Sequence, residues 1–372
     1  MKTLCLVAMV TAMATVSLGK VKGGEVIYVA SIVEKTVTTF AVNPDSGELT
    51  KISSLQLPES PGAMDLSPSG KHVYVAMAGR DAKTNKATAF VATLERHKDN
   101  TLTLSATAAI ATRPPYIRAD DSGQYLMMAH YASGEINVYR IKDGIVTSEH
   151  LDYHKTEKTA HCVEMDPSGR FVYVPHTAPN AIYQYVLDAA TGKLIPNTPP
   201  IVSGPDEGHQ YHQPRHIAFH PSLSMAFTSN ERGGGISAYS LNRKTGALKL
   251  KQTLSALPEG YTGGAAAADI RITPNGKFVY VSNRDLEERE PHQDSIAAFS
   301  INRRGDLQRI GTYSAVWFPR SMTINQSGRF LYAAGQKSGT LISYAIDAKT
   351  GALQTLKTYD VGDGAIWAMS AE

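Results

Sequence analysis

Apolar and polar residues alternate in short runs along almost the whole chain, and a small turn precedes many of these runs. The clearest examples read PSGKHVYVA, PSGRFVYVP and PNGKFVYVS. Phrases of this kind begin at Pro68, Asp121, Pro167, Pro221, Pro274 and Gln326. The turns are therefore roughly fifty residues apart, as in a repeat protein. Alternation with period two, bounded by Gly, Asp and Asn turns, predicts short β-strands.

A second phrase follows the first in each repeat, an alternating strand that ends in a charged hairpin. It reads ISAYSLNRKTGAL from Ile236 and ISYAIDAKTGAL from Ile342. A period of this length made only of strands and turns is typical of a β-propeller, with one four-stranded blade per repeat. The strand VIYVA at Val26 adds one more copy to the six turns. We therefore predict an all-β, seven-bladed propeller.

The two ends of the sequence predict how the ring closes. The N-terminal copy lacks the first strand of its blade, and the C-terminal VGDGAIWAMSAE supplies one strand with nothing after it. Joining Ile366–Met369 to Val26–Ala30 would complete the seventh blade from both ends and leave no free inner edge. Residues 24–372 are then a single propeller domain.

Composition narrows the classes of partner. Apolar residues make up 42% of the chain and charged residues 19%, and the net charge is +3. This charge is too small to indicate nucleic acid or an anionic membrane surface as a partner. We expect a monomer that binds a small molecule.

Residues 1–23 do not share the repeat. Lys2 precedes the apolar run Leu4–Leu18, and Ser17-Leu18-Gly19 offers a cleavage site near Gly19. This layout predicts a secretory signal peptide, and hence export to the periplasm or the medium. The run is short for a membrane span, and no other stretch is long enough. The alternative is a frayed N-terminal strand.

Residues at the same offset in successive blades should form rings around the axis. At the start of the first strands, one ring reads Gly62, Pro115, His161, Arg215, Ala268, Arg320 and Ile366. The next position includes Tyr116, Cys162, His216, Asp269 and Trp367. The second strands end with His130, His176, Asn230 and Asn283, and one position later with Tyr131, Glu231, Arg284 and Gln336. Polar groups thus gather at one mouth of the ring, which predicts a functional hollow there.

The residue types at this mouth indicate the chemistry. Arginines suit a carboxylate, a phosphate or a developing oxyanion, so Arg215 and Arg284 are predicted to hold such groups. His161 is the candidate base, with Glu231 orienting it or sharing the proton. The predicted substrate-binding residues are His130, His176, Asn230, Asn283, Arg320 and Gln336. Without a G-x-S-x-G turn, water is the expected nucleophile.

Two other sequence features, a cysteine and a histidine-rich stretch, give weaker evidence for a nucleophile or a metal site. Cys162 follows His161, but neighbours on a strand point to opposite faces, so we predict a buried structural cysteine. His216 and His220 would lie about 13 Å apart on one strand and cannot share an ion. His209 and His212 could do so, and this alternative stays open. No cofactor and no catalytic metal are predicted.

Several stretches resemble the propeller lactonase family, which includes bacterial 6-phosphogluconolactonases of the propeller type and fungal 3-carboxy-cis,cis-muconate lactonising enzymes. They are ADIRITPNGKFVYVSNRD, QPRHIAFHPS followed by SNE, SGRFLYAAGQKSGTLISYAI and VGDGAIW. The likeness covers about residues 25–371. It implies functional roles for the histidine of TAHC, the arginines of QPRH and SNRD, and the glutamate of SNE. These are His161, Arg215, Arg284 and Glu231.

The expected function is therefore metal-independent hydrolysis of a sugar-derived or other acidic lactone. An exported protein would rarely meet a phosphorylated sugar lactone of the cytoplasm, so the resemblance supports the ring-opening more than that substrate. One alternative is a lactone cycloisomerase of the muconate type. The other is a non-catalytic exported propeller that binds a carbohydrate or a protein through the same mouth.

Overall fold

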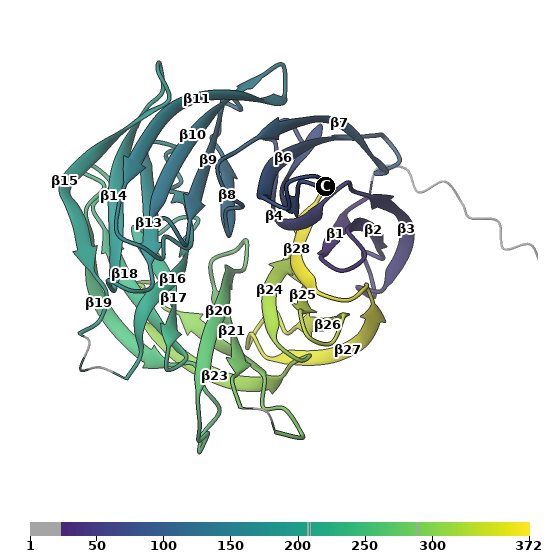
Figure 1. Ribbon diagram of the computed structural model, residues 1–372. Coiled ribbons are helices and arrows are strands. Elements are labelled where there is room, and N and C mark those ends of the chain that lie inside the picture. Colours follow the sequence, from purple (N-terminus) through teal and green to yellow (C-terminus); the bar gives the residue numbers. More distant parts are fainter. Residues whose placement is uncertain (1–23, 207, 209, 288) are drawn as a thin grey trace, which may run out of the picture.

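The chain folds into strands and turns arranged around one axis (Figure 1). A computed structural model describes residues 24–206, 208, 210–287 and 289–372. The strands of this part of the chain form seven four-stranded blades, so the predicted all-β propeller is confirmed.

Six blades are made of four consecutive strands that follow one another from the axis outward. Three are β4 (Ser60–Leu66), β5 (His72–Arg80), β6 (Ala87–Arg96), β7 (Leu102–Ala109); β8 (Tyr116–Ala119), β9 (Tyr125–His130), β10 (Glu135–Lys142), β11 (Ile145–Lys155); and β12 (Glu164–Met165), β13 (Phe171–His176), β14 (Ala181–Asp188), β15 (Lys193–Ser203). The others are β16 (His212–Phe219), β17 (Met225–Arg232), β18 (Gly235–Leu241), β19 (Leu248–Ser255); β20 (Ala265–Ile272), β21 (Phe278–Asp285), β22 (Ser295–Ile301), β23 (Leu307–Ser314); and β24 (Pro319–Ile324), β25 (Phe330–Gly335), β26 (Thr340–Ile346), β27 (Leu353–Asp360).

The seventh blade closes the ring as the sequence predicts. Its sheet order is β28 (Ala365–Ala371), β1 (Val26–Ser31), β2 (Thr36–Val42) and β3 (Leu49–Gln56). The antiparallel register places Ala368 opposite Val29. The last strand of the chain is thus the innermost strand of this closing blade, and the described ends meet within one sheet.

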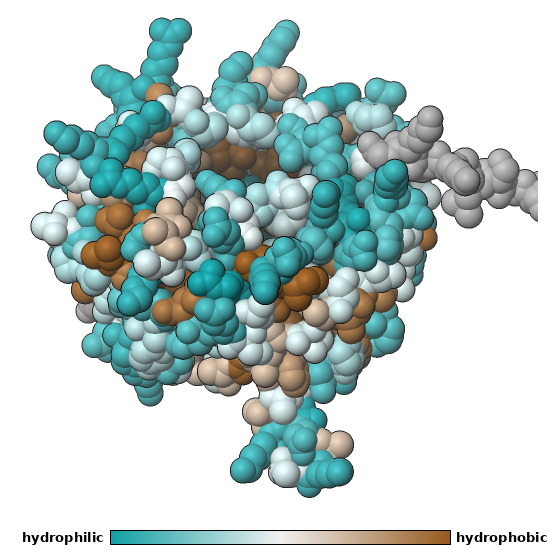
Figure 2. Space-filling model, turned by 90° about the horizontal axis from the view of Figure 1, so that it is seen from above, coloured by the Kyte–Doolittle hydropathy of each residue, from teal (hydrophilic) through white to brown (hydrophobic). Residues whose placement is uncertain are grey.

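Burial explains why the second strand of each blade reads as a continuous apolar run. Every residue of β1, β9, β13 and β25 is buried, because neighbouring blades cover both faces of these strands. The outermost strands, such as β7 and β27, are largely exposed. The side of the molecule in Figure 2 is accordingly mostly hydrophilic, with small scattered apolar patches.

A repeated tyrosine links neighbouring blades. It is the third residue of the second strand, and its hydroxyl donates to a backbone carbonyl in the β-hairpin of the next blade. The pairs are Tyr28 to Asn100, Tyr74 to Gly144, Tyr173 to Gly246, Tyr280 to Gly351 and Tyr332 to Gly47, at 2.6–3.3 Å. Because buried hydroxyl groups need a partner, each link favours one spacing between blades.

The Ser-Gly turns lie between the end of each first strand and the start of each second strand. Gly70, Gly169 and Gly328 adopt left-handed φ of 68°, 66° and 70° there, which glycine does without steric cost. The starts of the first strands and the ends of the second strands therefore share the opposite face, where the sequence places the functional hollow.

The predicted signal peptide, residues 1–23 with cleavage near Gly19, lies outside the described residues. Within the described part of the chain, no helix is long and apolar enough to cross a membrane.

Candidate functional site

Several residues at the mouth are positioned by an irregularity that recurs in five innermost strands, one extra residue near the point where the strand enters the channel. In β16 the register shifts between Pro214 and His216, which leaves Arg215 as the extra residue. Similar shifts make Arg320 the extra residue in β24 and Ile366 in β28. A β-bulge of this kind redirects a side chain, in these blades toward the central channel.

The backbone is left-handed two positions before His161, Arg215 and Arg320. The residues there are Thr159, Gln213 and Phe318, with φ of 70°, 69° and 63°. This conformation costs a non-glycine residue roughly 1–2 kcal/mol, and such strain is concentrated at functional sites. In the blade of β12–β15, the left-handed residue comes before a shortened innermost strand. Because β12 begins only at Glu164, His161 precedes the strand on which the sequence pattern placed it.

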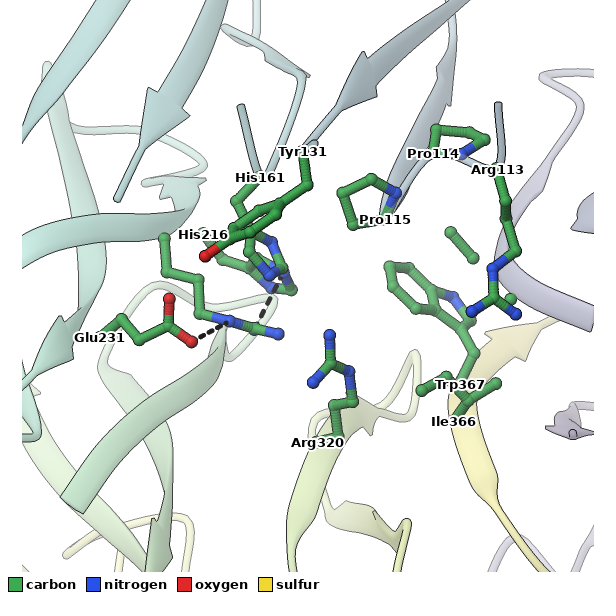
Figure 3. A pocket seen from close by; sticks show the side chains of 13 residues that line it. Arg113, Pro114, Pro115, Tyr131, His161, His216, Glu231, Arg320, Ile366 and Trp367 are labelled. Carbon is green, nitrogen blue, oxygen red and sulfur yellow. Dashed lines mark hydrogen bonds and ion pairs between the residues drawn. The ribbon is translucent and has the colours of Figure 1, made fainter. Parts of the chain in front are cut away.

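These side chains surround a cavity of about 340 Å³, which we call the mouth cavity. Its lining comprises Gly62, Ala63, Arg113, Pro114, Pro115, Tyr131, His161, Arg215, His216, Glu231, Arg320, Ile366 and Trp367. Figure 3 shows His161, His216 and Glu231 on one side, Arg113 across from them, and Arg320 reaching in from below. The first predicted ring supplies six of its seven members to this lining.

Glu231 is the centre of an ion-pair cluster. Its Oε1 accepts a hydrogen bond from Nη2 of Arg284 at 2.7 Å and lies 3.5 Å from Nε of Arg215. Burial opposes ionisation, but the charges of Arg215 and Arg284 outweigh it and hold the pKa of Glu231 below its usual range. The carboxylate is therefore ionised and oriented at neutral pH.

Arg284 lies behind Glu231 and not on the cavity lining. Its Nε and Nη2 donate to the carbonyl oxygens of Ala266 and Ala267, each at 3.3 Å, and its guanidinium covers the ring of Phe318 at 5.1 Å. All of its contacts hold it against the carboxylate. The guanidinium groups that reach the cavity are those of Arg113, Arg215 and Arg320.

His161 is buried, with 4% of its surface exposed, and its ring makes no hydrogen bond to a described residue. Its Nδ1 is fully enclosed, so Nε2 is the nitrogen that can reach the cavity. Burial lowers the pKa of His161 well below its ordinary value, and the charges of Arg215 and Arg320 add to the effect. A neutral imidazole that lies beside a cavity and has no hydrogen bond to a described residue can accept a proton from a water molecule.

None of the other predicted substrate-binding residues lies on the cavity lining, and four of them are buried inside the blades. His130 bonds to Thr112 at 2.8 Å and to Asn137 at 3.0 Å. His176 bonds to Thr156 and to the carbonyl of Val174, each at 2.8 Å. Asn230 and Asn283 are buried and donate to Ser237 and to the carbonyl of Ala256, while Gln336 is only partly buried and lies outside the lining.

Cys162 and two histidines of the HQYHQPRHIAFH stretch, His216 and His220, are buried. Cys162 is a free, buried cysteine as predicted, and burial raises the pKa of its thiol. Nδ1 of His216 contacts Asp269, whereas Nε2 of His220 contacts the carbonyl of Gly276. The described residues contain no group of three potential metal ligands, and His209 lies outside the described residues.

Sequence reasoning did not select Arg113, Tyr131, His216 and Trp367 as site residues. Tyr131, His216 and Trp367 stand at ring positions, but the site residues were selected from other ring members, whose side chains indicated a base, a carboxylate or an anion-binding group. Arg113 precedes β8 in a loop and belongs to no ring. An arginine two positions before a ring residue, in the run TRPP, is the signal that could have identified it.

Comparison with known proteins agrees with this architecture. The family model described as "Lactonase, 7-bladed beta-propeller" matches residues 26–369. A 6-phosphogluconolactonase of Yersinia enterocolitica is 28% identical over 92% of this chain and 97% of that protein, and one of Yersinia pseudotuberculosis is 29% identical with the same coverage. The solved structure of a periplasmic gluconolactonase of Pseudomonas aeruginosa superposes with a TM-score of 0.81 at 19% identity, over 94% of this chain and 99% of that one.

Proposed function

The chain belongs to the family of seven-bladed β-propeller lactonases, and from this premise we propose that it hydrolyses an acidic, sugar-derived lactone in the mouth cavity. One observation carries the proposal. An unpaired, buried imidazole shares a cavity with three guanidinium groups and one oriented carboxylate. This set can activate water and stabilise an oxyanion without a side-chain nucleophile.

In the proposed mechanism, Nε2 of His161 accepts a proton from water while the water oxygen attacks the lactone carbonyl carbon. The guanidinium of Arg215 donates to the oxyanion that forms. The ring C–O bond then breaks, and the protonated His161 returns its proton to the departing ring oxygen. The products are a free hydroxyl group and a carboxylic acid that ionises. Glu231, fixed by Arg284, holds Arg215 in place.

Arg113 and Arg320 support the preference for an acidic substrate. The guanidinium of Arg320 has no hydrogen bond or ion pair to a described residue, and Arg113 donates only a long hydrogen bond, 3.4 Å, to the carbonyl of Pro61. Burial and the nearby Arg284 lower the pKa of Arg320 to about 10, so it remains charged at neutral pH. Two cations without a protein carboxylate suit a phosphate or carboxylate of the substrate.

The proposed activity is tested by measuring acid release from a panel of lactones in a weakly buffered indicator assay. The panel contains D-glucono-1,5-lactone, its 6-phosphate, a uronic-acid lactone and an uncharged aliphatic lactone. We expect hydrolysis above the spontaneous rate, with the anionic lactones preferred. Failure to accelerate any of them would contradict the proposal and favour a binding protein.

Arg320→Gln is expected to reduce the preference for anionic over neutral lactone, measured as the ratio of kcat/KM values, about 10–100-fold. The estimate follows from the loss of one charge-assisted hydrogen bond in a partly buried site. The neutral lactone serves as the internal control. An equal loss on both substrates would show that Arg320 supports the fold or the chemistry and not the anion.

Arg284→Lys is expected to lower kcat about 10-fold. A lysine keeps the charge but cannot donate to Glu231 and to two carbonyl groups from one planar group, so Arg215 loses its fixed counter-charge. Lys244→Ala, in the exposed β18–β19 hairpin, is the control. Unchanged kinetics for Arg284→Lys would mean that Glu231 needs no support from this side.

The pH profile follows from the lowered pKa of His161. A base works in its neutral form, and a lowered pKa extends that form to lower pH. The acid limb of kcat/KM, which reports the free enzyme, is therefore expected well below pH 6.5, the ordinary value for histidine. A bound anionic substrate offsets the arginine charges that lower the pKa of His161, so this pKa should be higher in the complex than in the free enzyme. The acid limb of kcat should therefore lie at higher pH than the acid limb of kcat/KM. An acid limb of kcat/KM at or above pH 6.5 contradicts this assignment.

We also propose that the protein is exported and acts as a monomer. Export rests on the signal-like sequence of residues 1–23, and fractionation of cells expressing the full chain tests it. The expected result is a processed protein outside the cytoplasm, with a mass in light scattering of one chain.

A further inference from the structure

His216 lies at the floor of the mouth cavity and connects Arg215 to a buried carboxylate. Its Nε2 is 3.1 Å from Nη1 of Arg215, and its Nδ1 is 3.0 Å from Oδ1 of Asp269. These three residues are 1–3% exposed. The contacts form one continuous row from the cavity into the centre of the propeller.

The row admits only one arrangement of protons. A guanidinium can only donate, so Nε2 of His216 must accept from Arg215. The ring proton is then on Nδ1 and is donated to Asp269. Burial and the charge of Arg215 lower the pKa of His216 to about 4, in agreement with a neutral ring. A protonated ring would place two donors against each other.

Asp269 is itself held in place on several sides. Its carboxylate accepts hydrogen bonds from the backbone N–H groups of Ile270 and Met322, at 2.9 and 2.7 Å, and from Nη2 of Arg271 at 3.0 Å. Burial favours the neutral acid, but Arg271 and His216 outweigh it and keep the pKa of Asp269 below its usual range. The carboxylate is thus a fixed acceptor that selects the orientation and the tautomer of His216.

Arg215 is held at two of its nitrogens. Its Nε lies 3.5 Å from Oε1 of Glu231. Its Nη1 donates to the carbonyl oxygen of Ala268 at 2.7 Å as well as to His216, while Nη2 makes no hydrogen bond with a described residue. Two acceptors on Nη1 fix the plane of the guanidinium and leave the Nη2 edge for a ligand. Without His216, Glu231 at Nε and one carbonyl oxygen at Nη1 would remain to orient the guanidinium.

We infer that His216 and Asp269 are positioning residues that aim Arg215 at the reacting group. In this role His216 does not accept the substrate's proton, because its only lone pair is occupied by Arg215. The kinetic consequence rests on the proposed lactone hydrolysis, whereas the proton arrangement does not depend on it. A displacement of about 1 Å at such a group can cost about 100-fold in rate.

The decisive comparison is His216→Phe with His216→Gln. Phenylalanine keeps the ring shape but offers no acceptor, whereas the glutamine amide oxygen can reach the position of Nε2. We expect His216→Phe to lower kcat about 10–100-fold with little change in KM, and His216→Gln to recover most of the loss. Equal losses in both variants would make His216 a proton acceptor in its own right, and full activity in both would make it a packing residue. Either result overturns the inference.

A second measurement uses the unaltered protein and needs no turnover. The ring ¹⁵N chemical shifts of histidine-labelled protein report the tautomer of each ring, and the signals lost in His216→Gln identify those of His216. At pH 7 we expect a neutral ring with the proton on Nδ1. A proton on Nε2, or a charged ring, overturns the inference. If no lactone is hydrolysed, the proposed function fails while the tautomer still decides this point.

Discussion

Replacing His161 by alanine is expected to lower kcat for the preferred lactone about 10²–10⁴-fold, the usual contribution of a positioned base. The imidazole is the candidate base of the mouth cavity that makes no hydrogen bond to a described residue and is held neutral by its surroundings. Because the ring has no polar partner to lose, and the space it leaves opens onto the cavity, the melting temperature should change little.

The matched control for His161→Ala is Lys244→Ala, which is expected to leave both kcat and the melting temperature unchanged. Rates are measured at saturating and at limiting substrate, after subtraction of spontaneous hydrolysis. If His161→Ala retained full activity under both conditions, the proton would have to be taken by another group, and His161 would have no part in the reaction.

Deleting residues 362–372 is expected to prevent folding to a soluble monomer. The deletion removes β28, which pairs along the whole of β1 and buries Ala365, Trp367 and Ala368 between blades. It would leave β1 as an unpaired inner edge, the kind of edge that promotes aggregation. It would also remove two residues of the mouth cavity lining.

The control for this deletion is removal of residues 1–23, which should leave the melting temperature unchanged because β1, the first described strand, begins at Val26. Both proteins are compared by light scattering and thermal unfolding. A monomeric product of the C-terminal deletion with an unaltered melting temperature would contradict closure of the ring by β28.

The fold was predictable because similar turn-and-strand phrases begin roughly every fifty residues in six of the seven blades. The pairing of the two end strands in the closing blade followed from what the two ends lack. Superposition of the blades also predicted the ring that contains His161, Arg215 and Arg320. In two of these blades a bulge at that position turns the arginine side chain inward.

The second strands show why the remaining site residues were harder to select. Neighbouring residues at a strand end point in opposite directions. His130 therefore points between sheets, where Asn137 satisfies it, while the next residue, Tyr131, faces the cavity. In the same way, Asn230 is buried within its blade and bonded to Ser237, while Glu231 faces the cavity. Polarity alone does not distinguish the two positions, and Arg113 is placed by a loop that no periodic pattern describes.

The central claim is that water activated at the mouth cavity opens a lactone by attack on its carbonyl carbon. The most direct test is a turnover experiment in H₂¹⁸O with an anionic lactone, comparing the unaltered protein with His161→Ala by mass spectrometry of the product. We predict one ¹⁸O atom in the product carboxylate and a rate of labelling that falls about 10²–10⁴-fold in the variant. Product without label, as a cycloisomerase would give, or equal labelling rates in the two proteins would contradict the claim.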